Sequence, residues 1–334
     1  MARKYSDTWL EFEKSLGGVR PVLSGTPEEM RAQYRALGDA LQQSWPAIPE
    51  NVVVVDDKVS QIKLRIFMPP PSGQPVPLGV YYHGGGLVIG PSKGDDVVCG
   101  TLAHTTGSII VSVCYRLSPE HKSPVHLHDA IEAFKWAFDN AARLGADATK
   151  LFTFGSSSGG MLALAAARQI RLSRTGLPTH AVKGVIALCP VTTHPEAVFR
   201  PPEHRSLEEN ATDIPLVDKA ALITFSNAAG LHPTDLDYFT LLDRESHKLF
   251  PPTYIATCEF DPLRDDGVVL EEYLKLAGVP VKRDHYHNMP HVFFNVPTLP
   301  ETFGIFMKNT IQGIEWVVSQ PRDLTVSYKF LSNA

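Results

Sequence analysis

Short apolar runs alternate with helix-like segments over most of this chain, and this alternation is the strongest constraint on its fold. Eight runs have the length and apolar character of buried strands: 51–57, 62–70, 77–83, 108–114, 150–155, 183–189, 253–258 and 279–286. Helical patterns occur at 126–142, 160–172, 265–277 and 301–319. Strands that alternate with helices of this length predict a mostly parallel eight-stranded sheet flanked by helices. The first two runs have no helix between them, so we expect an antiparallel pair at that edge.

Two regions depart from the alternation. Residues 1–45 are polar with a helical pattern, and the stretch 190–252 is far longer than the usual connection of about 2–6 residues. We therefore predict N-terminal cap helices at 1–45, a core over 46–320 with a cap insertion at about 190–252, and a C-terminal tail over 321–334 to which we assign no role. Both unusual regions are expected to cover the C-terminal edge of the sheet.

Composition excludes several classes of function. The chain has 31 Lys and Arg residues and 36 Asp and Glu residues, so its net charge is −5. A mildly acidic chain does not have the excess of positive charge that is typical of proteins that bind nucleic acid. We find neither an apolar run of about 18–20 residues, which would span a membrane, nor the apolar core of a signal peptide. The four cysteines are far apart in the sequence and form no metal-binding pair. We therefore expect a cytoplasmic protein without a membrane span, a nucleic-acid partner or a structural metal.

The sharpest local motif is the G-x-S-x-G of residues 155–159. It follows the apolar run KLFTF and opens a helix rich in small residues. A strand-to-helix turn this tight needs glycine on both sides, because a Cβ there would collide with neighbouring backbone. The motif predicts Ser157 as a nucleophile, with the amide of Ser158 facing a developing oxyanion. The alternative is a Gly/Ser-rich turn that only connects two elements.

A second motif, His83-Gly84-Gly85-Gly86, follows the strand-like run 77–83. Consecutive glycines leave backbone N–H groups unshielded, and such donors stabilise the oxyanion of a tetrahedral intermediate. We expect His83 to brace this loop. The alternative is a phosphate-binding or linker loop, but neither a G-x-G-x-x-G pattern nor a Walker lysine follows.

A serine hydroxyl needs a base to take its proton and an acid to orient that base. In α/β sheets with this turn, the three groups follow the order Ser, Asp or Glu, His. Asp261 comes at the C-terminal end of the run 253–258, where catalytic groups collect, and is the candidate acid. His287 and His291 both follow at suitable positions, and spacing alone does not choose between them.

These motifs together resemble the hormone-sensitive-lipase-like branch of the α/β-hydrolases. The resemblance rests on HGGG, CYRLSPEHKSPVHLHDA (114–130), GSSSGG, EFDPLRDDG (259–267) and NMPHVFF (288–294), in that order and spacing. It implies the α/β-hydrolase fold with a helical cap. Within this branch, the sequence pattern is most similar to that of the intracellular carboxylesterases of fungal secondary metabolism.

The resemblance also implies a role for each matching residue. The nucleophile matches Ser157, the acid Asp261, and the base His291, since the family's histidine stands just before an apolar run that contains aromatic residues. The oxyanion donors match the amides of Gly84, Gly85 and Ser158. Tyr115, Arg116, Glu120 and Asp129 are expected to form a charged network that holds the oxyanion loop.

The sequence departs from the family pattern at three positions. Ser156 and Ser158 stand where the family usually has Asp and Ala, so a hydrogen-bonding carboxylate beside the nucleophile is lost. Leu87 replaces a common aromatic residue and is expected to reshape the acyl pocket. Trp9 and Phe225 are further candidates for the pocket lining.

The resemblance implies a serine carboxylesterase that hydrolyses short- or medium-acyl esters of small molecules through an acyl-enzyme, without a cofactor or metal. Two alternatives remain open. One is a natural-product lyase, cyclase or dehydratase that reuses the same site, and the other is a non-enzymatic receptor for a small ligand. The last strand-like run, 279–286, is available to form a homodimer through a sheet edge.

Overall fold

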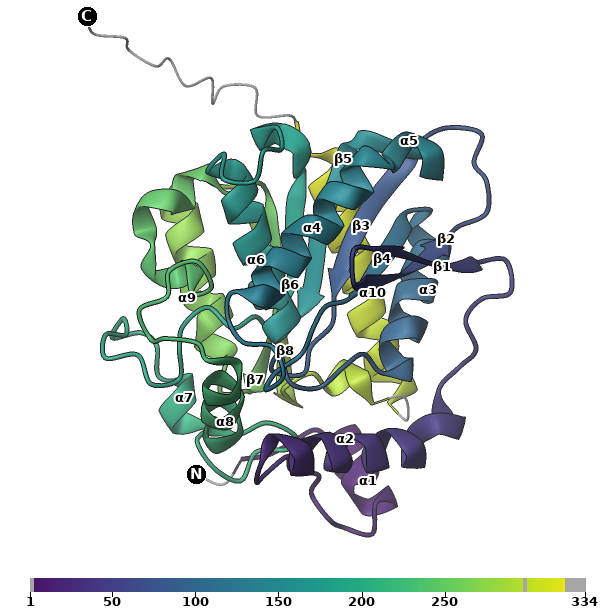
Figure 1. Ribbon diagram of the computed structural model, residues 1–334. Coiled ribbons are helices and arrows are strands. Elements are labelled where there is room, and N and C mark those ends of the chain that lie inside the picture. Colours follow the sequence, from purple (N-terminus) through teal and green to yellow (C-terminus); the bar gives the residue numbers. More distant parts are fainter. Residues whose placement is uncertain (1–2, 297–298, 322–334) are drawn as a thin grey trace, which may run out of the picture.

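The computed structural model describes residues 3–296 and 299–321, and its centre is one eight-stranded sheet (Figure 1). Its strands are β1 (Val53–Val59), β2 (Ile62–Met68), β3 (Val76–Tyr82), β4 (Ile109–Cys114), β5 (Ala146–Ser156), β6 (Gly184–Leu188), β7 (Thr253–Phe260) and β8 (Val281–Pro290). The strand order is β1-β2-β4-β3-β5-β6-β7-β8. Apart from Pro321, the predicted tail lies outside the described residues.

Pairing in the sheet is parallel from β4 to β8 and antiparallel where β2 joins β1 and β4. The expected antiparallel pair at the N-terminal edge is therefore confirmed. The burial of each strand depends on its position in the sheet. The edge strand β1 has no fully buried residue, whereas the central strand β6 is buried throughout. A continuous apolar sequence suits a central strand because both of its faces are covered.

Helices cover both faces of the sheet (Figure 1). On one face lie α3 (Lys93–Thr106) and α10 (Pro300–Ser319), and on the other α4 (Val125–Asp139), α5 (Ala141–Leu144), α6 (Ser158–Arg171) and α9 (Arg264–Leu276). The predicted mostly parallel sheet with flanking helices is thus confirmed. Within the described ranges, we find no helix with both the length and the apolar character needed to cross a bilayer.

Helix α3 is the main element that the sequence analysis missed. Its sequence contains two glycines, several threonines and β-branched residues, all poor helix formers. Tertiary packing overrides this propensity, since most of the helix is buried. A local signal was present, because the side chains of Ser92 and Asp95 each accept the other's backbone N–H in a capping box.

Strand β8 also differs from its prediction. The apolar pattern indicated a strand over 279–286, whereas the observed strand continues to Pro290. A register irregularity between Cys258 and Phe260 of β7 accompanies this extension. His287, which the sequence analysis placed after the strand, therefore belongs to β8.

The N-terminal segment and the long insertion meet below the C-terminal ends of the strands (Figure 1). The N-terminal segment contains α1 (Asp7–Ser15), α2 (Pro27–Leu41) and the 3₁₀ turn η1 (Gln42–Ser44). The insertion contains α7 (Ser206–Glu209), α8 (Lys219–Ala229), η3 (Thr240–Leu242) and η4 (Arg244–Leu249). Two further 3₁₀ turns are η2 (Thr179–Ala181) and η5 (Phe293–Asn295).

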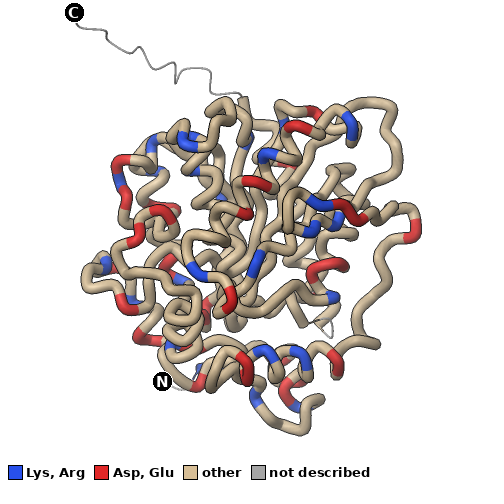
Figure 2. Tube along the Cα trace, viewed as in Figure 1, with Lys and Arg blue, Asp and Glu red and all other residues tan. Residues whose placement is uncertain are grey.

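A backbone hydrogen bond and an ion pair join the N-terminal segment to the insertion. The N–H of Leu23 donates to the carbonyl of Leu216 at 2.9 Å, within an isolated bridge that pairs Val22 with Leu216. Arg20 forms ion pairs with Glu13 at 2.8 Å and with Asp213 at 2.6 Å. Figure 2 shows acidic and basic residues interspersed along both segments. The division into cap and core stays a prediction.

Packing of α10 against the sheet generates a test of the fold. A Cβ added at Gly313 would lie 2.6 Å from the Tyr254 ring of β7, whereas one added at Gly304 of the same helix meets nothing within 4 Å. We expect Gly313→Ala to lower the free energy of unfolding by about 1–3 kcal/mol through overpacking. Gly304→Ala, the matched control, should raise it by about 0.5–1 kcal/mol because alanine favours the helix. Denaturant unfolding of both variants checks this, and equal effects would contradict it.

Candidate active site

The turn between β5 and α6 holds Ser157 in a strained conformation. Its φ is +55° and its ψ −122°, values that a residue with a side chain seldom adopts. The turn is possible because Gly155 and Gly159 allow the backbones to approach, since a Cβ at Gly159 would overlap the carbonyl oxygen of Tyr82 in β3. The N–H of Ser157 donates to the carbonyl of Leu188 at 2.8 Å. In this conformation the Ser157 hydroxyl faces His291.

Three side chains from separate segments meet at this hydroxyl. His291 Nε2 lies 3.0 Å from Ser157 Oγ, and His291 Nδ1 lies 2.7 Å from Asp261 Oδ2. Asp261 follows β7 and His291 follows β8, so the parallel sheet brings both to the edge where β5 ends. All three residues are buried, with Ser157 the most exposed at 8%. This is the arrangement in which an imidazole can take a proton from a hydroxyl.

The carboxylate of Asp261 sets the protonation behaviour of His291. Burial opposes the charged imidazole, but the charge and hydrogen bond of Asp261 outweigh it and raise the pKa of His291. Asp261 is itself held by its other oxygen, which accepts the Leu263 N–H at 2.7 Å. The backbone carbonyl of Asp261 also accepts from the Asn210 side chain at 3.2 Å, which ties the insertion to the site.

The two histidines that the spacing left open lie in different environments. His291 is 1% exposed and contacts Ser157. His287 is 75% exposed at its side chain and points toward Glu259, with Nδ1 3.4 Å from Oε2. The structure therefore brings only His291 to the serine.

The glycine loop after β3 lies directly against the Ser157 turn. A Cβ added at Gly84 would be 3.2 Å from the Ser156 carbonyl oxygen and 3.5 Å from the Ser157 Cβ. Gly85 adopts a φ of +110°, which only glycine enters readily. Among the described residues, the N–H groups of Gly84, Gly85 and Ser158 donate to no protein acceptor. They are thus available to an oxygen bound beside Ser157.

Buried polar contacts brace this loop. The Tyr115 hydroxyl donates to the His83 carbonyl at 2.8 Å, and the two rings stack with centroids 4.2 Å apart. Burial lowers the pKa of His83 and so favours its neutral ring, and its Nδ1 lies 2.7 Å from the Gly84 carbonyl. Ser158 Oγ accepts the Leu87 N–H at 3.3 Å, a contact that an alanine at position 158 would lack.

The rest of the expected network supports neighbouring segments. The buried carboxylate of Asp129 accepts the backbone N–H of Arg116 at 2.9 Å and the Arg116 guanidinium at 2.6 Å. Glu120 pairs with Arg31 of α2 at 2.7 Å, and Arg31 also donates to the carbonyl of Val88 just beyond the glycine loop. These contacts hold the loop between α2 and α4.

A buried carboxylate that the sequence analysis did not foresee lies behind the loop. Asp95 of α3 is 4% exposed and accepts the hydroxyls of Tyr81 and Ser92. Tyr81 in turn approaches Ser156 Oγ at 3.5 Å. A carboxylate is therefore present near position 156, but it comes from another helix. The capping-box pattern at Ser92 was the signal that could have placed Asp95 at a buried helix start.

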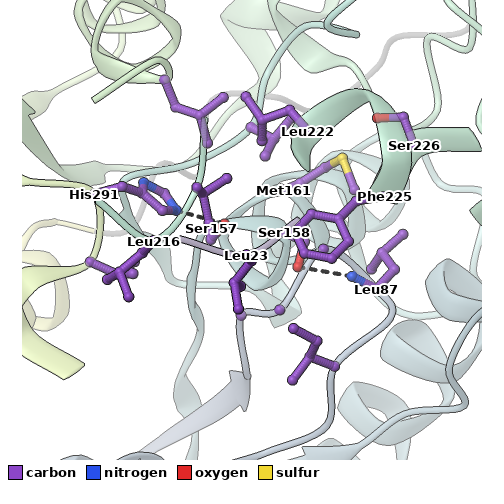
Figure 3. Close-up of a pocket in the computed structure, with 18 of the residues that line it drawn as sticks. Leu23, Leu87, Ser157, Ser158, Met161, Leu216, Leu222, Phe225, Ser226 and His291 are labelled. Atoms are coloured by element: carbon purple, nitrogen blue, oxygen red, sulfur yellow. Dashed lines mark hydrogen bonds between the residues drawn. The ribbon is translucent and has the colours of Figure 1, made fainter. Parts of the chain in front are cut away.

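A mostly apolar cavity opens above Ser157 (Figure 3). Leu87 and Phe225, both predicted pocket residues, line it. Phe225 lies over Gly86, where a Cβ would overlap its ring. Other lining residues come from the N-terminal segment, the insertion and α6: Leu23, Tyr34, Leu37, Met161, Leu207, Leu216, Val217, Leu222 and Leu231.

Trp9 was predicted to line the pocket, and the structure corrects this prediction. It is fully buried within the N-terminal segment, and it does not line the cavity. Its indole N–H donates to Glu13 Oε1 at 2.9 Å, and its ring packs against Phe12 at 5.1 Å. Tyr34 and Leu23 supply the apolar contribution of this segment instead, because α2 and the chain before it lie nearer the serine.

Comparison with known proteins agrees with this geometry. A family model described as the alpha/beta hydrolase fold matches residues 79–295, more than half of the chain. The chain is 44% identical over 335 residues to the versiconal hemiacetal acetate esterase of Dothistroma septosporum, covering 98% of this chain and 99% of that protein. The chain belongs to the α/β-hydrolase family.

Further relatives agree on the class of enzyme. The chain is 34% identical over 254 residues to Esterase LipI of Mycobacterium tuberculosis, covering 74% of this chain and 76% of that one. The structure of a hyperthermophilic esterase from Pyrobaculum calidifontis matches with a TM-score of 0.82 and 26% identity, over 95% of this chain and 100% of that chain. The comparisons confirm the predicted fold, the resemblance to fungal carboxylesterases and the class of carboxylic ester hydrolase.

Proposed function

We propose that this hydrolase cleaves short-acyl esters of bulky alcohols through an acyl-enzyme on Ser157. His291 Nε2 takes the proton from Ser157 Oγ as the oxygen attacks the ester carbonyl carbon. The tetrahedral intermediate collapses, the bond to the leaving alcohol breaks, and the protonated imidazole gives its proton to that alcohol. This order of steps is supported by the chain of contacts at the site. Ser157 Oγ lies 3.0 Å from His291 Nε2, and His291 Nδ1 lies 2.7 Å from Asp261 Oδ2.

Water completes the reaction by the same route. His291 takes a proton from a water molecule, whose oxygen attacks the acyl carbon and displaces Ser157 Oγ, which regains a proton from the imidazole. In both halves, the N–H groups of Gly84, Gly85 and Ser158 stabilise the oxyanion. Loss of one such donor typically costs about 10²–10³ in rate.

The shape of the cavity supports a small acyl group. The whole cavity that opens at Ser157 has a volume of about 80 Å³. Because one ordered water needs roughly 10–15 Å³ of such space, the cavity has room for about six waters, which supports a short acyl chain over a long one. The alcohol must lie toward His291, from which it receives a proton. The acyl group then lies on the opposite side of Ser157, beside Leu87, Met161 and Phe225 (Figure 3).

A second, wider opening supports a large alcohol. A groove of about 880 Å³ runs between α2 and the segment 115–121. It shares Tyr34, Leu37, Ile89, Gly90 and Asn295 with the cavity, so the two spaces adjoin between the glycine loop and the segment after His291. The name of the Dothistroma septosporum relative, an esterase of a hemiacetal acetate, agrees with such a substrate. A cytoplasmic location and a homodimer through β8 stay predictions.

Hydrolysis of aryl esters of graded acyl length, from acetate to octanoate, tests the proposal. The wild-type protein should release the phenol with a preference for short chains. Ser157→Ala and His291→Ala should each lose on the order of 10⁴-fold or more in kcat. An organophosphonate should add one adduct to the wild-type protein, at Ser157, and none to Ser157→Ala.

Two results would count against this assignment. One is alanine variants that keep most of the wild-type turnover, which would place the chemistry elsewhere. The other is an organophosphonate adduct without turnover of any ester in the series, which would favour a lyase or cyclase that reuses the site.

The pH dependence follows from the Asp261–His291 pair. Because Asp261 raises the pKa of His291, the imidazole becomes a free base only above its reference pKa of about 6.5. We expect kcat/KM to rise with pH through a midpoint above that value. Asp261→Asn removes the charge, so the midpoint should move down while kcat falls by about 10³–10⁴-fold. Initial rates from pH 5 to 10 measure both effects, and a flat profile would contradict the role of the imidazole.

Phe225 should set the limit on acyl length. Phe225→Ala opens space beside the glycine loop, and each added methylene that becomes buried there contributes about 0.8 kcal/mol. Burial of about two of the four methylenes that hexanoate adds to acetate corresponds to about 1.6 kcal/mol, so we expect the kcat/KM ratio of hexanoate to acetate to rise on the order of tenfold. Phe199→Ala is the matched control, since Phe199 belongs to the same insertion, is 71% exposed and does not line the cavity. An unchanged ratio in Phe225→Ala would move the acyl group to another part of the site.

A further inference from the structure

Three potential metal ligands converge at the C-terminal ends of β7 and β8, outside the proposed reaction centre. Glu259 of β7 and His285 and His287 of β8 each offer an oxygen or a nitrogen atom, and these atoms all lie within 4.8 Å of one another. The two imidazole rings are 4.6 Å apart and nearly perpendicular. His287 is 75% exposed and Glu259 35% exposed at their side chains, so an ion from solvent can reach them.

Strand geometry explains why these side chains meet. His285 and His287 are two residues apart in β8 and therefore point to the same face of the sheet. Thr257 of β7 pairs with His285, and the register shifts between Cys258 and Phe260. Such an irregularity re-aims a side chain at a strand end. Glu259 lies within this irregularity, with its carboxylate turned toward His287.

The surroundings of His285 fit a metal ligand. Its Nδ1 lies 2.9 Å from Thr257 Oγ1, and that hydroxyl also accepts from Arg283 Nη1 at 3.2 Å. A hydroxyl has two lone pairs, so it can accept from both the arginine and an Nδ1–H of His285. The neutral ring then carries its free lone pair on Nε2. Metal-bound histidines are commonly oriented in this way, by a hydrogen bond from the other ring nitrogen.

The neighbouring arginine side chains form ion pairs with other carboxylates and not with the three proposed ligands. Arg283 is paired with Glu271 of α9. Arg264 pairs with Asp265 at 2.8 Å and with Glu209 at 2.7 Å. Glu259 Oε2 accepts the Asn288 N–H at 2.8 Å, and its separation of 3.4 Å from His287 Nδ1 is longer than a usual hydrogen bond.

We propose that Glu259, His285 and His287 bind one divalent ion of the zinc class, with water completing its coordination. Two histidines and a glutamate form a known zinc ligand set. Ligands at 2.0–2.2 Å in a tetrahedral site lie about 3.4 Å apart. Glu259 Oε2 and His287 Nδ1 are already 3.4 Å apart, and no pair of the three ligand atoms exceeds 4.8 Å, so small side-chain movements suffice. The exposed side chain of His287 is free to make such a movement. Imidazole ligands favour Zn²⁺ over Mg²⁺, which prefers oxygen ligands and retains its waters.

The proposed metal site lies close in sequence to the proposed acid and base. Glu259 stands two residues before Asp261, and His287 stands four residues before His291. An ion held by Glu259 and His287 therefore ties together the two segments that carry the proposed acid and base. Binding stabilises the folded state when the ion does not bind the unfolded chain. We expect Zn²⁺ to raise the melting temperature.

Calorimetric titration of the full-length chain, first freed of metal by a chelator, tests the site. Zn²⁺ should bind with a stoichiometry of one per chain, and Mg²⁺ should not bind. His285→Ala and Glu259→Gln should each weaken Zn²⁺ binding at least about tenfold and abolish the thermal shift. His128→Ala, which removes an exposed histidine on α4, is the matched control and should bind like the wild-type protein.

A second trio of atoms, from Cys189, Asp261 and His291, must be distinguished because it also lies within 4.8 Å. If Zn²⁺ binding survives in His285→Ala but is lost in Cys189→Ser, the ion binds at the reaction centre and the proposal is wrong. Binding that is undiminished in His285→Ala and Glu259→Gln, or no binding to the wild-type protein, also overturns it. His285→Ala should retain the esterase activity of the wild-type protein, and this activity serves as the check that the variant is folded.

Discussion

Close contact between backbones at the β5–α6 turn is the constraint on which the rest of the site depends. Gly155 and Gly159 let the start of α6 lie against the end of β3, where any side chain would overlap the Tyr82 carbonyl. This contact holds Ser157 at a positive φ and places the glycine loop against the same turn. The same close packing therefore presents both the hydroxyl and the amides, which explains why glycines flank Ser157 and form the loop beside it.

The insertion is joined to the same sheet edge by buried charge. Asp266 in the first turn of α9 accepts the backbone N–H groups of Thr192 and Thr193, at 2.6 Å and 2.8 Å. Asp265 accepts those of Arg205 and Ser206. A carboxylate that satisfies buried N–H groups is costly to move. The cavity walls contributed by the insertion are thus held by the helix that directly follows Asp261.

Much of the fold and the reaction centre could be predicted from local patterns. The strand-like runs, the turn at Ser157 and the position of Asp261 each follow from a few neighbouring residues. The order of β3 and β4, the buried helix α3 and the contribution of Asp95 could not, because they depend on contacts between segments distant in the sequence. Trp9 shows a different limit, since an aromatic residue on a helix can face either the cavity or its own segment, and only the structure shows that its ring packs on Phe12 and Glu13.

The sequence by itself determined the types of group available: a serine between glycines, a glycine loop after a strand, and an acid and two histidines in the expected order. Spacing alone left His287 and His291 open, the family resemblance implied His291, and only the tertiary structure gives the physical reason. The two are four residues apart and chemically identical, but one lies within β8 and faces solvent, whereas the other lies beyond it and contacts Ser157. Their difference arises from where β8 ends, and that end depends on pairing with β7, which joins residues about thirty positions apart.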